Sequence, residues 1–185
     1  KETDLAIRSA VNAKANGFNH QVVVVDNGSK EILKLSADMK KAGVDLIRSE
    51  SNLGFTGGNN LAMSHAVKHY QTDYFFLLNS DAEVEKEGIQ KLWEAVKDDP
   101  KAGIAVSKIY FTPGLEFHRK SYSKSEKGKV LWYAGGSIDW PNLVAYHRGV
   151  DEVDRGQFDN QKTCDFATGC ALFVKRVVTE HIGIL

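Results

Sequence analysis

Residues 74–78 form an unbroken apolar run, Tyr-Phe-Phe-Leu-Leu, and this run limits the possible folds of the chain more than any other stretch. A short apolar run without alternation is typical of a strand buried on both faces of a parallel sheet. Asn79, Ser80 and Asp81 follow it directly. Ligands of open α/β sheets bind beyond the carboxyl ends of such strands, where Asn and Asp oxygens suit a hard cation. The same residues also turn chains and cap helices, so this stretch alone leaves both roles open.

The first 109 residues repeat one pattern, in which amphipathic helical segments alternate with short apolar strands. The spacing of apolar residues predicts helices at 3–15, 32–43, 62–70 and 89–96, and strands at 21–25, 44–47, 74–78 and 103–109. Short connections between these elements imply right-handed crossovers and a parallel sheet. The pattern begins with a helix that no strand precedes, so we expect that an opening strand ahead of Lys1 is missing.

The pattern changes after Tyr110. Residues 118–129 carry five basic side chains against one acidic side chain, which is typical of a solvated loop; a clamp for a phosphorylated acceptor is the alternative. Residues 130–146 alternate in short pieces and predict a hairpin or antiparallel strands. We therefore expect one α/β domain over residues 1–185, with a mostly parallel, Rossmann-like sheet between helices on both faces and a small antiparallel part.

Composition and charge exclude several classes of protein. Lys plus Arg and Asp plus Glu each count 24 in the 185 residues, so no net field favours nucleic acid as a partner. No apolar run approaches the ~20 residues that span a bilayer, and the first residues show no signal-peptide pattern. Cys164 and Cys170 have the spacing of neither a disulfide framework nor a zinc site, which favours reduced thiols. We expect a cytoplasmic protein.

Polar side chains follow three of the predicted strands. They lie in the segments 26–29 (Asp-Asn-Gly-Ser), 52–60 (Asn-Leu-Gly-Phe-Thr-Gly-Gly-Asn-Asn) and 79–81 (Asn-Ser-Asp). In a parallel sheet all three segments meet at the carboxyl edge, where a nucleotide binds. Each segment alone could be turn chemistry or backbone freedom only, and 52–60 matches neither a Walker loop nor a dinucleotide fingerprint. Their joint placement favours a nucleotide-diphosphate site.

These segments also carry a resemblance to a known family. Val-Val-Val-Val-Asp-Asn-Gly-Ser at 22–29, the glycine-rich segment 52–60 and Leu-Leu-Asn-Ser-Asp-Ala-Glu-Val at 77–84 resemble the nucleotide-sugar half of family 2 glycosyltransferases. Tyr-Ala-Gly-Gly at 133–136 and Asp-Phe-Ala-Thr-Gly at 165–169 are similar to acceptor-side motifs of the bacterial rhamnosyltransferase-like branch. The resemblance covers nearly the whole chain, and its motifs occur in the family's order.

The resemblance implies a GT-A fold in which residues 1–109 bind the nucleotide sugar and residues 110–185 form an incomplete acceptor side. It also implies that Asp26 contacts the base or ribose of the donor and that Asp81 coordinates Mg²⁺ or Mn²⁺ on the donor diphosphate. Asn79 stands where the family's Asp-x-Asp motif has its first acid, so the diphosphate and water must supply most of the metal's ligands. The donor-binding residues implied in this way are Asp26, Asn27, Gly28, Ser29, Asn52, Gly54, Asn59, Asn60, Asn79, Ser80 and Asp81.

The resemblance further implies transfer with inversion, in which a carboxylate takes the proton of the attacking acceptor hydroxyl. The family's base lies in a Glu-Asp motif beyond the Thr-Gly segment, and no such motif precedes Leu185. We therefore expect the base beyond Leu185, and a family member that is shortened at both ends. Asp165 is the nearest substitute within the chain, although a turn or capping role is the alternative for it.

Other polar and aromatic residues have both a functional and a structural interpretation. His65 and His69 lie four residues apart on one predicted helix and could ligate a metal, but solvated helix histidines are the simpler explanation. Further side chains could stack on a sugar or contact a phosphate, or could serve packing alone: Trp132, Trp140, Tyr146, His147 and Arg148.

The sequence thus predicts an inverting, metal-assisted glycosyltransferase of the hexosyltransferase type. Its partners would be a nucleoside-diphosphate sugar and a polysaccharide or lipid-linked acceptor, with association at the inner face of the membrane as one option. Two alternatives remain open. One is a non-catalytic fragment that binds nucleotide sugars, and the other is a sugar-phosphate nucleotidylyltransferase, which is expected to carry a Gly-rich, Arg-containing loop after its first strand.

Overall fold

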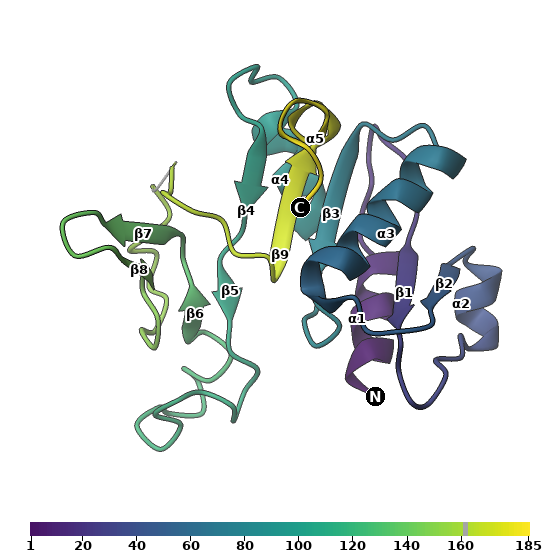
Figure 1. Ribbon diagram of the computed structural model, residues 1–185. Coiled ribbons are helices and arrows are strands. Elements are labelled where there is room, and N and C mark those ends of the chain that lie inside the picture. Colours follow the sequence, from purple (N-terminus) through teal and green to yellow (C-terminus); the bar gives the residue numbers. More distant parts are fainter. Residues whose placement is uncertain (161–162) are drawn as a thin grey trace. The chain divides into compact units, whose positions relative to one another are not determined.

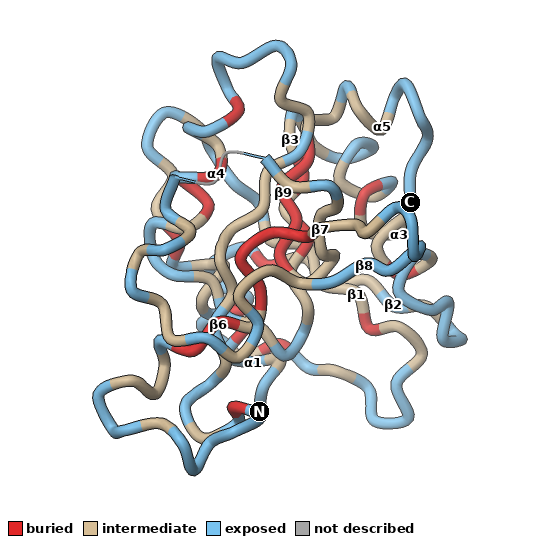
Figure 2. Tube along the Cα trace, turned by 90° about the vertical axis from the view of Figure 1, so that its left-hand side faces the viewer, coloured by how far each residue is buried: buried red, intermediate tan, exposed pale blue. Residues whose placement is uncertain are grey.

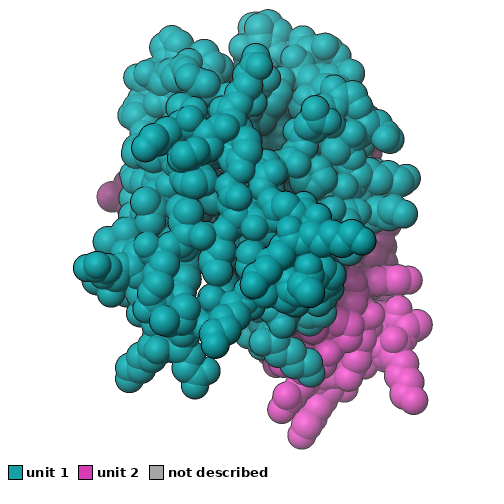
Figure 3. Space-filling model, turned by 90° about the vertical axis from the view of Figure 1, so that its right-hand side faces the viewer, with its two compact units in different colours: residues 1–105, 169–185 teal, residues 106–168 magenta. Residues whose placement is uncertain are grey.

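The computed structural model of the chain describes residues 1–160 and 163–185 and divides into two compact units. Unit 1 comprises residues 1–105 and 169–185, and unit 2 comprises residues 106–168; Figure 3 colours them teal and magenta. Residues 169–185 therefore belong to the same unit as residues 1–105. The predicted division into a donor half and an acceptor half stays a prediction.

Unit 1 alternates helices and strands, as the apolar periodicity predicts (Figure 1). Its helices are α1 (Glu2–Val11), α2 (Ala37–Lys41), α3 (Gly54–His69), α4 (Gly88–Val96) and α5 (Arg176–Ile182). Its strands are β1 (Val23–Asn27), β2 (Asp45–Ser49), β3 (Tyr74–Leu78), β4 (Ile104–Val106, at the boundary with unit 2) and β9 (Ala171–Lys175). The helix predicted over 32–43 is shorter in the structure. The Leu33 N–H donates to the Asp26 carboxylate, so this part of the chain belongs to the turn after β1, and α2 begins only at Ala37.

The strands of unit 1 form two separate sheets. β1 pairs in parallel with β2, with Val23 opposite Asp45. β3 pairs antiparallel with β9, with Tyr74 opposite Lys175, and β4 lies on the other side of β9. The α/β class is therefore confirmed, and parallel pairing holds for β1 and β2. The predicted single, mostly parallel sheet is not confirmed, because β3 belongs to a second sheet and pairs antiparallel with β9. The neighbour of β3 is a strand from the end of the chain, whose buried apolar residues 171–174 cover one of its edges.

The core of unit 1 lies around β3, β9 and α4. Ile89, Leu92 and Val96 recur on one face of α4 and are buried in a cluster with Phe173 of β9. Figure 2 shows buried segments along β3 and β9 in red. A second cluster connects α1 to α2 and contains Ile7, Leu35, Met39 and Val44. The two clusters hold the helices against their sheets and so position the turns that follow β1 and β3.

The glycine-rich segment 52–60, predicted as a loop, is helical from Gly54 onward and forms the first turns of α3. Intrinsic helix propensity disfavours glycine at such positions. Packing overrides propensity here, because a Cβ on Gly58 would lie 3.0 Å from Nδ2 of Asn27 at the end of β1. Glycine lets the helix approach the strand closely, and the prediction of a loop is wrong from Gly54 onward.

A cavity of about 1270 Å³ lies between β1 and β3 within unit 1. Each strand uses one edge for pairing, β1 with β2 and β3 with β9, and both strands line the cavity. Two helices supply further walls, with Ala6 and Ile7 from α1 and Ala62 and Met63 from α3. The opening strand expected ahead of Lys1 stays a prediction.

Unit 2 contains short antiparallel strands: β5 (Ile109–Tyr110), β6 (Leu131–Tyr133), β7 (Gly136–Asp139) and β8 (Val144–His147). The hairpin of β7 and β8 confirms the prediction for residues 130–146. Val130, Leu131 and Tyr133 are fully buried and form the core of the unit. The Tyr133 hydroxyl donates a hydrogen bond to the Phe166 carbonyl at 2.8 Å, and burial raises the pKa of Tyr133 above its usual range.

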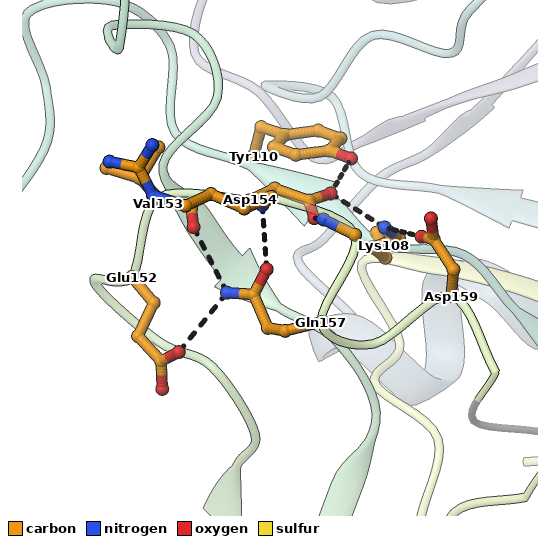
Figure 4. A network of polar contacts seen from close by, with 9 residues as sticks. Lys108, Tyr110, Glu152, Val153, Asp154, Gln157 and Asp159 are labelled. Carbon is orange, nitrogen blue, oxygen red and sulfur yellow. Dashed lines mark hydrogen bonds and ion pairs between the residues drawn. The ribbon is translucent and has the colours of Figure 1, made fainter.

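A network of polar contacts connects β5 to the segment after β8 (Figure 4). The Lys108 ammonium group contacts the carboxylates of both Asp154 and Asp159. The Tyr110 hydroxyl and the Gly156 N–H also donate to Asp154, at 2.6 and 2.8 Å. Only 10% of the Asp154 side chain is exposed. Burial opposes its charge, but hydrogen bonds from Lys108 and Tyr110 outweigh burial and lower the pKa of Asp154 to about 2.

We expect Asp154→Asn to destabilise unit 2 by about 2 kcal/mol at neutral pH. Because folding lowers the pKa of this carboxylate, its contribution is present above the ordinary value of 3.8 and is lost as the pH falls toward 2. Asp159→Asn is the matched control on the same lysine; its carboxylate is 62% exposed, so its loss should cost well under about 1 kcal/mol. Urea unfolding followed by tryptophan fluorescence, at neutral pH and near the pKa of Asp154, measures both variants. A loss for Asp154→Asn that does not shrink in acid contradicts the prediction.

Candidate functional site

The predicted donor-binding residues lie in unit 1, in the turns after β1, β2 and β3 and in the first turns of α3. β1 and β3 point toward the same end of the unit in Figure 1, so the turns that follow them lie at that end. The predicted residues that line the cavity between β1 and β3 are Asn27, Gly54, Asn59, Asn79, Ser80 and Asp81. The carboxyl end of this cavity is the candidate site.

Asp26 is buried, with 3% of its surface exposed, and is not among the residues that line the cavity. Its carboxylate accepts hydrogen bonds from the backbone N–H groups of Ser29 and Leu33, both at 3.1 Å, and forms an ion pair with Arg48. Hydrogen bonding from Ser29 contributes most to lowering the pKa of Asp26 to about 2, and bonds from Leu33 and Arg48 add to it. The charged carboxylate thus holds the turn 26–29 in shape.

Arg48 is a residue of the site that the sequence analysis does not single out. Its guanidinium group pairs with Asp26 and donates to the Ser29 carbonyl at 3.0 Å, so it connects β2 to the turn after β1. The parallel register sets Asp26 directly opposite Arg48. The sequence does contain a signal for this pair. Arg48 directly follows the strand predicted at 44–47, and Asp26 directly follows the strand predicted at 21–25.

Asn27 and Asn52 connect the turn after β1 to the start of α3. Asn27 Nδ2 donates to Asn52 Oδ1 at 3.2 Å and to the Gly54 carbonyl at 3.0 Å. Asn27 Oδ1 accepts a hydrogen bond from the Leu53 N–H at 2.9 Å. At Gly28, where φ is +73°, a Cβ would lie 2.5 Å from the backbone nitrogen of Asn52. The amides and the glycine therefore fix the backbone at the carboxyl end of the cavity.

The turn after β3 holds the one acidic side chain among the predicted residues that line the cavity. Its backbone is fixed, because the Asn79 N–H donates to the Cys170 carbonyl at 2.9 Å and the Asn79 carbonyl accepts from the Ala82 N–H at 3.1 Å. Ser80 and Asp81 are exposed. Burial, and then the nearby charge of Asp81, raise the pKa of the Cys170 thiol. Asp81 therefore combines exposure to solvent with a fixed backbone at the cavity.

The described residues, 1–160 and 163–185, contain no group of three or more His, Cys, Asp or Glu side chains that could hold a metal ion. The turn after β3 offers one carboxylate, Asp81, and one amide, Asn79. Carboxylate and amide oxygens suit Mg²⁺ or Mn²⁺, but these ions take about six ligands. These two residues therefore fit a cation that takes most of its ligands from a nucleotide diphosphate and from water.

His65 and His69 stack on each other along α3, with ring centroids 4.3 Å apart. His65 contacts the Asp45 carboxylate of β2 at 3.0 Å, and the Tyr70 hydroxyl donates to the same carboxylate. Hydrogen bonds from Tyr70 and His65 lower the pKa of Asp45. The contacts connect α3 to β2, so the structural interpretation of the two histidines accounts for them.

The candidates in unit 2 make contacts within that unit. Asp165 Oδ2 accepts a hydrogen bond from the Ile138 N–H of β7 at 2.9 Å, a structural contact between distant segments rather than the local turn or cap considered for it. Trp132 packs edge-on against His147, with ring centroids 4.5 Å apart. Arg148 donates to a backbone carbonyl at 2.9 Å. The exposed aromatic candidates are Trp140 and Tyr146.

Two comparisons with known proteins bear on this site. The sequence model of "Glycosyl transferase family 2" matches residues 3–182. The chain is also 25% identical, over 165 residues, to the "Low-salt glycan biosynthesis hexosyltransferase Agl10" of Haloferax volcanii. That match covers 89% of this chain and 47% of the relative, so the chain spans about half the length of the curated protein. Within the part of the chain that the structure describes, no helix is long and apolar enough to cross a membrane.

Proposed function

Since the chain belongs to glycosyl transferase family 2, we propose that it binds a nucleoside-diphosphate sugar and moves the sugar to a polysaccharide or lipid-linked acceptor. One observation carries the proposal: the exposed Asp81 lies on a fixed turn at a cavity of about 1270 Å³ beyond the end of β3. Asn27 and Asn59 line the same cavity. Only the carboxyl end of the cavity, where these polar side chains gather, belongs to the proposed donor site.

In this proposal Asp81 and Asn79 hold Mg²⁺ or Mn²⁺ together with the donor diphosphate. The bound ion supplies electrostatic stabilisation of the charge that develops on the departing diphosphate. Asp26 and Arg48 keep the turn 26–29 in the shape that receives the nucleoside. The further donor-binding residues Gly28, Ser29, Asn52, Gly54, Asn59, Asn60 and Ser80 form the walls and backbone of the same site.

The acceptor hydroxyl must lose its proton to a carboxylate, and attack opposite the diphosphate inverts the anomeric carbon. Asp165 is the remaining candidate within the chain, and its carboxylate already accepts the Ile138 N–H. We therefore assign the base to a carboxylate beyond Leu185 in a longer protein. Because the spacing of Cys164 and Cys170 matches no disulfide framework, the proposal includes a reducing, cytoplasmic location.

Calorimetric titration with UDP-, GDP- and dTDP-sugars, with and without Mn²⁺, tests the proposal. The candidate site offers the ion a single carboxylate, so the ion should bind well only together with the donor diphosphate. We therefore expect Mn²⁺ to strengthen nucleotide-sugar binding at least about tenfold. The matching nucleoside monophosphates lack the diphosphate and should not respond to Mn²⁺. If no nucleotide sugar binds in a metal-dependent way, the proposal fails. Because the base is assigned beyond Leu185, metal-dependent binding without transfer to an added acceptor is the result expected of residues 1–185 alone.

A further inference from the structure

Residues 115–129 form an irregular segment between β5 and β6, which we name the basic loop (Figure 1). It contains no helix and no strand. The loop is anchored to unit 2, because the Tyr122 hydroxyl donates to the Asp151 carbonyl at 2.6 Å and Arg155 pairs with Glu126 at 3.0 Å. The side chains of the loop therefore project from a fixed support.

The basic loop concentrates positive charge on a chain whose formal net charge is zero. Its acids do not balance that charge at the surface, since Glu116 is 3% exposed and Glu126 is paired with Arg155. Five cations of the basic loop make no side-chain hydrogen bond or ion pair with any residue in the described ranges: Arg119, Lys120, Lys124, Lys127 and Lys129. Surface lysines commonly lie near acids, whereas these five cations have no acidic partner among the described residues. The cluster therefore favours binding of an anionic partner.

Two large apolar side chains flank the buried Glu116 at the start of the basic loop. Leu115 is 68% exposed and Phe117 is 67% exposed. The ring of Phe117 packs edge-on against Phe111, with centroids 4.8 Å apart, which fixes its position without covering it. Exposed apolar side chains next to unpaired cations are typical of segments that lie in the interface of an anionic membrane.

We propose that the basic loop docks unit 2 onto an anionic phospholipid surface. Leu115 and Phe117 enter the boundary between headgroups and acyl chains, and the cations contact lipid phosphates. A free phosphate or a phosphorylated sugar satisfies the cations but offers nothing to the two apolar side chains. The lipid surface satisfies both, and this docking is independent of the donor site in unit 1.

Co-sedimentation with vesicles of phosphatidylcholine, alone or mixed with phosphatidylglycerol, tests the charge requirement. We expect binding to the mixed vesicles only, and binding that weakens as salt is raised. Each cation near an anionic surface strengthens binding about fivefold, so Lys120→Ser with Lys124→Ser should weaken it about 30-fold. Lys40→Ser with Lys41→Ser removes the same charge from the exposed face of α2 and should leave binding unchanged. Equal losses for the two pairs overturn the proposal.

The exposed apolar side chains of the basic loop distinguish docking on a membrane from binding of a soluble phosphate. Phe117→Ser should weaken vesicle binding about tenfold. Ile32→Ser is the matched control, because Ile32 is 62% exposed but lies in unit 1, and it should leave vesicle binding unchanged. Full displacement of the protein from vesicles by inorganic phosphate at constant ionic strength, or no effect of Phe117→Ser, overturns docking on lipid. Nucleotide-sugar titration of the same variants should match the unaltered chain. A failure of the donor-site proposal is therefore distinguishable from a failure of this one.

Discussion

We expect Asp81→Ala to remove the metal-dependent part of donor binding and to lower the proposed sugar transfer about 100-fold to 1,000-fold. Asp81 is the one acid among the predicted residues that line the cavity, so its loss leaves a bound cation only the Asn79 amide from this turn. Asp81 is exposed and lies on a turn held by backbone hydrogen bonds. The substitution should therefore leave the thermal unfolding midpoint unchanged.

Calorimetry with and without Mn²⁺ measures the effect of Asp81→Ala directly. Glu83→Ala is the matched control, because Glu83 is exposed, carries the same charge and is not among the residues that line the cavity. It should keep the full response to Mn²⁺. Retention of that response by Asp81→Ala would falsify the assignment of the metal to this turn.

We expect Gly28→Ala to destabilise unit 1 by about 3 kcal/mol and to abolish nucleotide-sugar binding. Gly28 has a φ of +73°, and its Cβ would lie 2.5 Å from both the Asn52 nitrogen and the Ser51 carbonyl carbon. Both atoms belong to the backbone and cannot rotate away. The two turns of the site must therefore separate to admit the methyl group.

Gly43→Ala isolates the cost of the backbone conformation from the cost of the clash. Gly43 has a similar φ of +78°, but no atom lies within 4 Å of its Cβ position. Its substitution should cost only about 1 kcal/mol and should leave donor binding intact. Urea unfolding and nucleotide-sugar titration of the two variants measure the difference. Equal costs in both assays contradict the close approach of the two turns.

Local sequence patterns were sufficient to predict most elements of unit 1, but not the pairing of β3. The apolar run 74–78 predicts a strand buried on both faces whichever neighbour it has. Phe75 and Leu77 on one face are buried, whereas the alternate residues on the other face are half-buried. Its partner comes from residues 171–175, far along the chain, and runs antiparallel. Apolar periodicity carries no information on such a distant pairing, because any apolar strand could cover that edge.

The residues of the candidate site were also easier to predict than their contacts. The strand-end rule brought Asn27 and Asp81 to one cavity, as the structure has them. The rule does not reveal that Asn27 and Asn52 bond to each other, nor that Asp26 is held by Arg48. Side-chain amides and carboxylates bond to whatever donors the fold brings near, and those donors are set by tertiary packing.

The cavity between β1 and β3 also bears on how unit 1 unfolds. The β1–β2 sheet and the β3–β9–β4 sheet share no ladder of backbone hydrogen bonds. Cooperative unfolding of the two sheets therefore depends on side chains that pack through α1 and α3. The β1–β2 pair with its turn 26–29 is thus a separate hydrogen-bonded module. The candidate site takes residues from both sheets, so it is complete only while the two sheets stay packed together.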